Sequence, residues 1–401
     1  MKKALILSAA VALTIIVAGC SSSTGGDPGD VNPAAGISGD LTGAVVWSSG
    51  TYVSGDTYVT SGASLTIDPG VTVTFASDAS LVVEAGGSLS AIGTSAAGGG
   101  IVFKNATSAA WDGIYFDDDA VDNTLQYCEV TGVGSGGYAI TMDPGSIADI
   151  QYCVVHGNGG GGIDARSCAN GTYIYDNRFY DNTRYGLAVC DNVSFGNTNS
   201  FAAASDSDGP DLSDLYNSVL FSGDIWNADR IFTITEVPYR FEYGSTILAD
   251  ASLYLEPGVT LHFDAGAGLM VMAGGFIVAE GDSTDGVVLE GTNSAASWTG
   301  LYFDDDSIGN VLLYCAISGV YGGYAVTLDP DSIADIRKCT IDGNHAGGID
   351  AAFAVAGTVV SNNTFGDNGD SSSSPYDLIY NNTFTPAGNT ASATLHNASD
   401  D

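Results

Sequence analysis

The chain has 401 residues, with 47 acidic side chains against 10 basic ones and a formal net charge of −37 at pH 7. This balance excludes a nucleic-acid-binding protein that relies on phosphate contacts, because such proteins are basic. It also disfavours electrostatic binding to anionic lipids or strongly anionic glycans. The 54 glycines accompany 20 tyrosines and 15 phenylalanines, so tight turns between packed strands explain the glycine better than disorder does.

Residues 1–19 are predicted to be a lipoprotein signal peptide. They begin with the basic segment MKK and continue with an apolar run too short to span a membrane comfortably as a mature helix. The run VAGC, which ends at Cys20, resembles the lipobox of bacterial lipoproteins, although leucine is commoner than valine at its first position. The resemblance implies a lipid on Cys20 and, with Ser21 next, sorting to the outer membrane. The alternative is an ordinary cleaved signal with an incidental cysteine.

Residues 20–41 are rich in serine and glycine and are predicted to be a flexible tether. Cleavage after residue 19 would remove Lys2 and Lys3 and no acidic residue. The mature chain would then carry eight basic and 47 acidic residues, a net charge of −39. A surface of this kind stays soluble in salt.

Beyond the tether, the sequence contains one long internal repeat. The run WDGIYFDDD at Trp111 returns as WTGLYFDDD at Trp298, and LTIDPGV at Leu65 returns as LYLEPGV at Leu253. The offset between the copies is 186 to 188 residues. A repeat of this length predicts a tandemly duplicated architecture.

The duplication sets the expected domain organisation, with a turn-rich acidic segment between the halves and an acidic tail. The predicted parts are a first half at 42–195, a boundary or linker at 196–222, a second half at 223–385 and a tail at 386–401.

A shorter period of about 24 residues recurs within each half. Leu125 and Cys128 return as Ile150 and Cys153 after 25 residues. Short apolar alternations at this spacing, with glycine-rich turns between them, predict a parallel coil in which each turn lays its strands on those of the turn before. A helical solenoid would need apolar residues spaced three or four apart, and the mature chain has no such run. The sequence therefore predicts an all-β fold.

The runs LTIDPGVTVTF, LVVEAGGSLSAIG, NTLQYCEVTG and IYDNRF resemble the right-handed parallel β-helix proteins of the pectin-lyase-like superfamily, in particular repeat-bearing exported bacterial proteins. The resemblance covers roughly Leu41 to Phe384 and implies a right-handed parallel β-helix. It is specific for fold and poor for function, because the same coil carries pectate lyases, polygalacturonases, adhesins and plain surface proteins.

Six cysteines follow Cys20, and an even number in an exported chain predicts a disulfide framework. Adjacent strands lie about 4.8 Å apart, which is within the range that a disulfide tolerates. The coil period therefore suggests three pairs, each about one coil apart: Cys128 with Cys153, Cys168 with Cys190, and Cys315 with Cys339. The alternative is six free buried thiols.

One basic cluster, formed by Arg166, Arg178 and Arg184 with Tyr180 nearby, is the candidate catalytic site. Lyases of this fold need a strong base and often Ca²⁺, so the resemblance implies that these residues could serve a lyase. The second half keeps none of the cluster, and the motifs of polygalacturonase-like hydrolases are incomplete. The alternative is that the arginines lie on exposed strand faces and offset nearby aspartates.

The FDDD turns are the candidate metal site. The coil period places Asp117 beside Asp143 and Asp304 beside Asp329. Neighbouring carboxylates repel by about 1 kcal/mol or more near a surface, and a bridging Ca²⁺ would remove that cost. The alternative is that the turns are solvated and bind no ion. The sequence predicts no other cofactor.

These observations favour a non-enzymatic lipoprotein displayed on the bacterial outer membrane or cell surface, used for adhesion, glycan binding or envelope structure. Both copies share core and turn residues, whereas the basic cluster is unshared. The expected partners are the membrane, through the lipid, and a polysaccharide or another surface protein, but not nucleic acid. The alternative is a polysaccharide lyase or glycoside hydrolase, which should show a groove where Arg, Tyr and Asp converge.

Overall fold

The computed structural model describes residues 15–16, 36–201, 218–226, 229–292, 298–321, 323–369, 376–380, 386–389 and 395–398. The predicted lipidation residue Cys20, nearly all of the predicted signal peptide and most of the tether lie outside these residues. So do 202–217 of the predicted linker and half of the predicted tail. Among the described residues, no helix is long and apolar enough to cross a bilayer.

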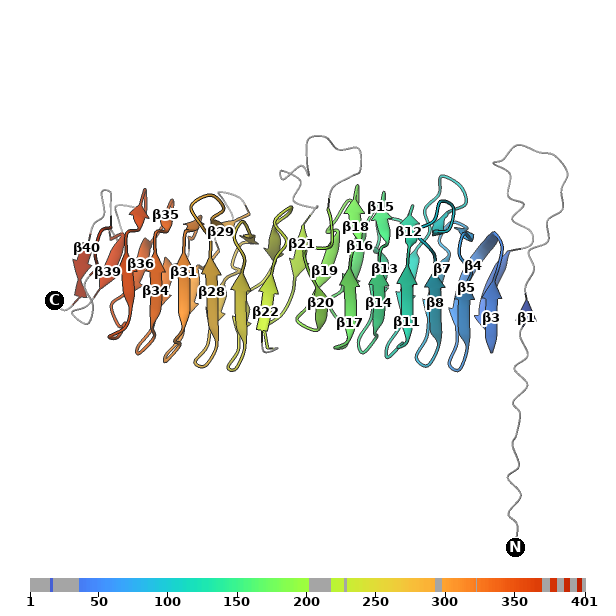
Figure 1. The fold of residues 1–401 in the computed structure, drawn as a ribbon, viewed down its shortest axis with the longest axis horizontal. Helices are drawn as coiled ribbons and strands as arrows, with labels where there is room; N and C mark the ends of the chain where they lie inside the picture. Colours follow the sequence, from blue (N-terminus) through green and yellow to red (C-terminus); the bar gives the residue numbers. More distant parts are fainter. Residues whose placement is uncertain are drawn as a thin grey trace, which may run out of the picture. The chain divides into compact units, whose positions relative to one another are not determined.

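The structure is an all-β parallel solenoid, and the chain divides into two compact units, residues 1–160 and 161–401 (Figure 1). Each coil of unit 1 adds one strand to each of three parallel stacks. Stack 1 contains β1 (Ile15–Ile16), β3 (Ala44–Trp47), β5 (Ser64–Ile67), β8 (Ser88–Ile92), β11 (Asn123–Gln126) and β14 (Ala148–Gln151). Stack 2 contains β6 (Thr72–Phe75), β9 (Ile101–Asn105), β12 (Cys128–Thr131) and β15 (Val154–His156). Stack 3 contains β7 (Ser80–Val83), β10 (Gly113–Phe116) and β13 (Tyr138–Met142).

The first coil of unit 1 contains one long strand that serves more than one stack. In β4 (Thr51–Val59), the first residues pair with β6 of stack 2 and the last residues pair with β7 of stack 3. The strand β2 (Ile37–Leu41) pairs along β4 with a shift in register. The pairing of β4 with both β6 and β7 therefore starts stacks 2 and 3 in the first coil.

Unit 2 starts with the last coils of the first repeat and continues through the second. Its first strands are β16 (Gly161–Ala165), β17 (Thr172–Tyr175), β18 (Arg178–Tyr180), β19 (Leu187–Val189) and β20 (Val193–Phe195). The second repeat also has three stacks, which are numbered by their equivalence in sequence to those of the first repeat. Stack 1 contains β22 (Asp229–Phe232), β25 (Ser252–Leu255), β28 (Phe276–Glu280), β31 (Asn310–Leu313), β34 (Ala334–Arg337) and β37 (Val359–Ser361). Stack 2 contains β21 (Val219–Phe221), β23 (Tyr239–Phe241), β26 (Thr260–Phe263), β29 (Val287–Gly291), β32 (Cys315–Ser318), β35 (Thr340–Asp342) and β38 (Thr364–Phe365). Stack 3 contains β24 (Ser245–Ile247), β27 (Leu269–Val271), β30 (Leu301–Phe303), β33 (Tyr324–Leu328), β36 (Gly347–Ala351), β39 (Leu378–Tyr380) and β40 (Leu395–Asn397).

Within unit 2 the two repeats form one continuous ladder. Leu187 of β19 pairs with Val219 of β21, and Val219 pairs with Tyr239 of β23. Because β19 is a stack 3 strand of the first repeat and β23 is a stack 2 strand of the second, the ladder passes from one stack to another at β21.

Alternation along each strand builds the core. Inward residues repeat one coil later at the same position, as Leu65 and Leu89 do, and they are fully buried. Each repeat also buries a tryptophan on a phenylalanine of the coil before. The Trp111 ring lies 3.9 Å from Phe75, and the Trp298 ring lies 4.3 Å from Phe263. The indole nitrogen of Trp298 donates to the Ser318 carbonyl at 2.8 Å.

Two tryptophans near the starts of the two repeats differ in their exposure. Trp47 is 1% exposed and belongs to the core, whereas Trp226 is 51% exposed. Trp226 therefore lies outside the core. The backbone N–H of Trp226 donates to Asp191 instead, so local polar contacts hold this residue at the surface.

Buried asparagines, among them Asn177 and Asn363, join one coil to the next. The Asn363 side chain accepts from the Cys339 N–H at 2.9 Å and donates to the Ile336 carbonyl at 2.9 Å. Asn177 donates its backbone N–H to the Asn199 side chain at 3.0 Å. These side chains satisfy backbone groups that the turns leave without strand partners.

Replacing Trp298 with alanine should cost about 3–5 kcal/mol of unfolding free energy, because it removes a fully buried ring. Trp298→Phe keeps the stacking on Phe263 but loses the indole hydrogen bond, at about 1–3 kcal/mol. Urea unfolding followed by far-UV circular dichroism measures both. The exposed Trp226→Phe control should change by less than about 0.5 kcal/mol, and an equal loss at both sites would contradict this account of the core.

Candidate functional site

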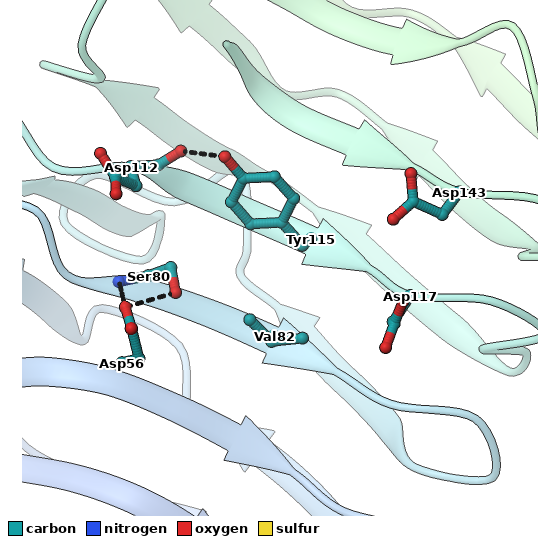
Figure 2. Close-up of a pocket in the computed structure, with 7 residues that line it drawn as sticks. All are labelled: Asp56, Ser80, Val82, Asp112, Tyr115, Asp117 and Asp143. Carbon is teal, nitrogen blue, oxygen red and sulfur yellow. Dashed lines mark hydrogen bonds between the residues drawn. The ribbon is translucent and has the colours of Figure 1, made fainter. Parts of the chain in front are cut away.

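A groove of about 330 Å³ lies on the outer side of stack 3 in unit 1 (Figure 2). It is lined by Asp56, Ser80, Val82, Asp112, Tyr115, Asp117 and Asp143. Outward positions of successive coils meet here, because Val82 of β7 pairs with Tyr115 of β10. Asp56 lies within β4, Asp112 and Asp117 flank β10, and Asp143 follows β13. The alternation that buries the core therefore also presents this row to solvent.

Hydrogen bonds orient the groove side chains. The Asp56 carboxylate accepts from both the backbone N–H and the hydroxyl of Ser80, at 3.1 and 2.8 Å. The Tyr115 hydroxyl donates to the Asp112 backbone carbonyl at 3.0 Å. Figure 2 shows Asp117 and Asp143 on the other side of the tyrosine ring.

The charges in the groove repel one another. Burial raises the pKa of Asp112, and the charges of Asp78 and Asp56 add to that effect. Burial also raises the pKa of Tyr115, helped by the charges of Asp112 and Asp143. No residue that lines the groove is basic. The groove is therefore suited to a neutral or cationic ligand and unsuited to an anionic one.

The second repeat has a groove at the equivalent place in unit 2, with a volume of about 420 Å³ and a neutral lining. Its outward row, Thr246, Met270 and Tyr302, follows the same register as the row in unit 1. It is lined by Gly244, Ser245, Thr246, Gly266, Gly268, Leu269, Met270, Thr299, Gly300 and Tyr302. By the repeat alignment, Gly244 and Thr299 take the places of Asp56 and Asp112. Both copies keep the tyrosine and differ in charge.

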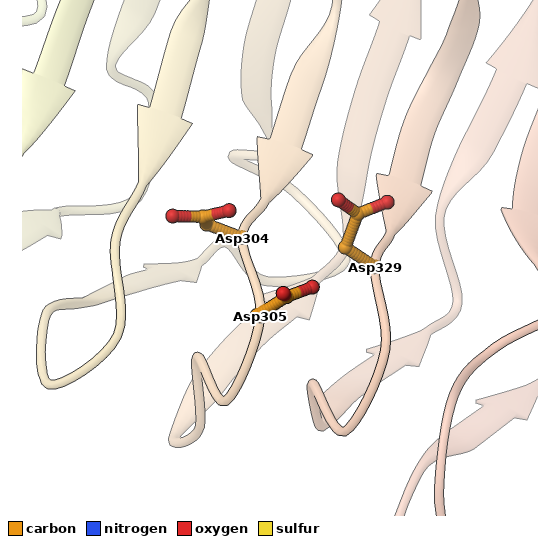
Figure 3. A group of neighbouring side chains, drawn as sticks. All are labelled: Asp304, Asp305 and Asp329. Atoms are coloured by element: carbon orange, nitrogen blue, oxygen red, sulfur yellow. The ribbon is translucent and has the colours of Figure 1, made fainter.

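The predicted neighbours in the FDDD turns are confirmed as neighbours. Phe116 pairs with Met142, which brings Asp117 beside Asp143. In unit 2, Asp304, Asp305 and Asp329 place carboxylate oxygens within 4.8 Å of one another (Figure 3). Three hard oxygen ligands at this spacing fit a Ca²⁺ ion, and these residues would hold it.

Charge is concentrated around this cluster. Loss of water around the carboxylate raises the pKa of Asp305, and the charges of Asp329 and Asp304 raise it further. The Tyr302 hydroxyl donates to Asp329, and this bond raises the pKa of Tyr302 to about 12. In the next coil, burial and then the charge of Asp329 raise the pKa of Asp350.

The predicted basic cluster does not converge on one point. Ile163 of β16 pairs with Leu187 of β19, so Arg166 follows one strand and Arg184 precedes its neighbour. Six residues of extended chain separate these ends by roughly 20 Å. Arg166 contacts Asp164 through two hydrogen bonds, at 2.9 and 2.7 Å.

Arg178 and Tyr180 lie together on β18 and not on β16 or β19. They are two residues apart on β18, with the Arg178 guanidinium 5.2 Å from the Tyr180 ring centre. The Arg178 guanidinium therefore contacts the ring of a residue on its own strand. This geometry agrees with the interpretation that the arginines offset local charge on the surface.

The six cysteine side chains are thiols in this structure, and they lie in the three predicted pairs. Glu129 pairs with Val154, which places Cys128 opposite Cys153, and Ala316 pairs with Thr340, which places Cys315 opposite Cys339. Disulfide formation itself stays a prediction.

A comparison with known protein families agrees with the architecture. The family model described as "Right handed beta helix region" matches residues 46–228. This stretch is a right-handed β-helix. A search of curated proteins found no match. Among solved structures, the A-module of the mannuronan C-5 epimerase AlgE4 from Azotobacter vinelandii is similar at 13% identity, covering 88% of this chain and 91% of that one. Its TM-score is 0.27, so we infer nothing about activity from it.

Sequence reasoning missed the groove residues Asp56, Asp112, Tyr115 and Tyr302. A signal was present, because the runs WDGIYF and WTGLYF keep a tyrosine at the same outward position in both copies. A tyrosine kept in a solvent-facing strand position is not needed for the core. The missing information was which outward positions of successive coils share one groove.

Millimolar Ca²⁺ should raise the melting temperature of the full chain by a few degrees, because an ion that binds only the folded state stabilises it by mass action. Asp329→Asn should abolish most of that rise, since Asp329 belongs to the carboxylate cluster. Asp331→Asn, at an exposed position of the same turn, is the matched control. Scanning calorimetry with Ca²⁺ or EDTA measures the shift, and the same rise in all three proteins would exclude this site.

Asp350→Asn should stabilise the protein at pH 7 in EDTA. A carboxyl with a raised folded-state pKa stabilises the fold below its unfolded pKa, and that stability is lost as pH rises through the folded pKa. The charged form therefore costs stability at pH 7, and asparagine retains the oxygen that accepts from the Ala352 N–H. The gain should shrink towards pH 3. Urea midpoints across this range test it, and a gain independent of pH would rule out the charge as its cause.

Proposed function

We propose that this protein is a non-catalytic, lipid-anchored β-helix that binds glycan at the bacterial cell surface. The glycan carries no net negative charge, and it lies in the acidic groove of unit 1. The observation that carries the proposal is the lining of that groove, which combines carboxylates with a tyrosine and contains no basic residue.

The groove chemistry argues against uronate lyase activity. A lyase must bind an anionic sugar and remove a proton with a group that is deprotonated near neutral pH. Here the carboxylates would repel the sugar, and the raised pKa of Tyr115 makes its phenol a poor base. Tyrosine rings and carboxylate oxygens remain good partners for the faces, hydroxyls and amino groups of neutral or cationic sugars.

The duplication supports binding as well. Both repeats keep the tyrosine of the groove, and they differ in the charges beside it. Catalysis requires a fixed set of groups in a fixed geometry, whereas binding tolerates such divergence. A lipid on Cys20, followed by the tether, would hold the coil at the outer membrane.

A glycoside hydrolase is the second candidate, because one observation favours it. Such enzymes pair a protonated carboxylic acid with an ionised carboxylate. Asp112 has a raised pKa, and Asp56, which contributes to it, lies in the same groove. In that case Asp112 would donate a proton to the leaving oxygen.

A polysaccharide panel separates these functions. We expect neither reducing ends nor unsaturated uronate to be released from cationic, neutral or anionic polysaccharides, with or without Ca²⁺. We expect calorimetry to detect binding of chitosan oligosaccharides, weakened about tenfold or more by Asp112→Asn with Asp143→Asn, on the order of 1.4 kcal/mol.

The matched control is Asp118→Asn, an exposed residue of the same turn that does not line the groove. Reducing ends lost in Asp112→Asn would establish the hydrolase. Unsaturated uronate lost in Arg178→Ala or Arg184→Ala would establish a lyase at the basic cluster. Tight binding of polygalacturonate alone would also refute the proposed ligand class.

A further inference from the structure

The three cysteine pairs occupy two kinds of position. Cys128, Cys153, Cys315 and Cys339 lie at equivalent places in the strand ladders of stack 2, and each is 1–2% exposed. Their thiols also donate to backbone carbonyls inside the coil, as Cys339 does to Leu312 at 3.3 Å. Reagents in solution cannot reach these sulfurs while the coil is closed.

Cys168 and Cys190 lie outside the ladder. Ala165 pairs with Val189 at the ends of β16 and β19, so both cysteines fall in the turns that follow these strands. Cys168 is 1% exposed, whereas Cys190 is partly exposed. One sulfur of this pair is therefore accessible and the other is shielded behind it.

The surroundings of the pair favour charge on the accessible sulfur. A hydrogen bond from the Cys168 thiol lowers the pKa of Cys190 to about 7, and the nearby Arg230 contributes to the lowering. The pKa of Cys168 is raised by the same contact and by burial. Thr172, whose buried hydroxyl has no other side-chain or backbone partner among the described residues, lies beside the Cys168 thiol.

We propose that Cys168 and Cys190 form a redox-active pair whose disulfide opens and closes in the folded protein, while the other two pairs stay inaccessible until the coil unfolds. A thiolate near neutral pH, partly exposed and with a resolving thiol beside it, has the features of a reactive cysteine.

The exchange partner is a disulfide or dithiol in solution. On closing, the Cys190 thiolate attacks one sulfur of an external disulfide and expels a thiolate, which leaves a mixed disulfide on Cys190. The Cys168 thiol then loses its proton and attacks the Cys190 sulfur, which expels the second thiolate. Two cysteine thiols are oxidised and the external disulfide is reduced to two thiols. A dithiol reverses both steps.

The cross-link would act on the junction between the repeats in unit 2. Asp191, the next residue after Cys190, has a side chain that is fully buried and ion-paired to Arg230 at 2.8 Å. It also accepts from the Trp226 N–H at 2.8 Å. Closing the disulfide would fix the turn that positions Asp191, so the oxidised protein should melt at a higher temperature than the reduced one.

The first experiment uses native full-length protein. It is treated with dithiothreitol, pulsed with N-ethylmaleimide and mapped by mass spectrometry. We expect a label on Cys190, appearing about tenfold or more faster than on the other five cysteines of the coil, and loss of that label after oxidised glutathione. Equal labelling of all three pairs, or no labelling of Cys190 without urea, would overturn the proposal.

The second experiment uses Cys168→Ser, which removes the resolving thiol and keeps a hydroxyl that can donate to the Cys190 sulfur in its place. Without a resolving thiol, Cys190 should retain glutathione as a stable mixed disulfide in the folded protein. The matched control, Cys315→Ser, should leave Cys339 free of glutathione under the same conditions. Absence of the mixed disulfide in a folded Cys168→Ser protein would refute the reactivity of Cys190, and its presence on Cys339 would refute the selectivity.

Discussion

The parallel register between one coil and the next is the constraint on which the rest of the structure depends. Each strand takes its backbone hydrogen bonds from the coil before, so a residue is fixed opposite its counterpart about 24 positions earlier. A one-residue slip would turn every core side chain to solvent. The Trp–Phe stacks and the buried asparagines reinforce the same register, because each of them joins two coils and not two parts of one coil.

The same register created the grooves and their charge. The register places equivalent residues of successive coils side by side, in the core and on the outer surface alike. Where successive coils have aspartate at one outward position, their charges therefore lie side by side. In the core the stacking of equivalent residues is favourable, since apolar rows exclude water. On the surface, loss of water raises the pKa of carboxyl groups such as Asp112 and Asp305, and the neighbouring charges raise it further. A bound cation or a cationic ligand relieves that cost, which is why the acidic rows are the chemically distinctive part of this surface.

The fold and the neighbours across coils could be predicted from the sequence because both depend on period alone. Cys128 opposite Cys153 and Asp304 beside Asp329 follow from counting residues. The groove could not be predicted in this way. Which of several outward aspartates share a hollow depends on turn lengths and side-chain directions, and Asp56 and Asp112 are 56 residues apart in sequence. The separation of Arg166 from Arg184 shows the converse: they are close in sequence, but they flank opposite ends of the paired strands β16 and β19.

Because the ladder changes stack at β21, equivalent residues of the two repeats belong to different ladders and face different directions within unit 2. Asp164 on β16 and Asp350 on β36 are counterparts in the repeat, yet β16 belongs to the ladder that continues into β23, and β36 belongs to a separate sheet. Within unit 2 a straight ligand that follows one of these rows would leave the other untouched. The two counterparts therefore have different surroundings: Arg166 neutralises Asp164 in one copy, and an alanine, Ala352, stands at the same place as Arg166 in the other.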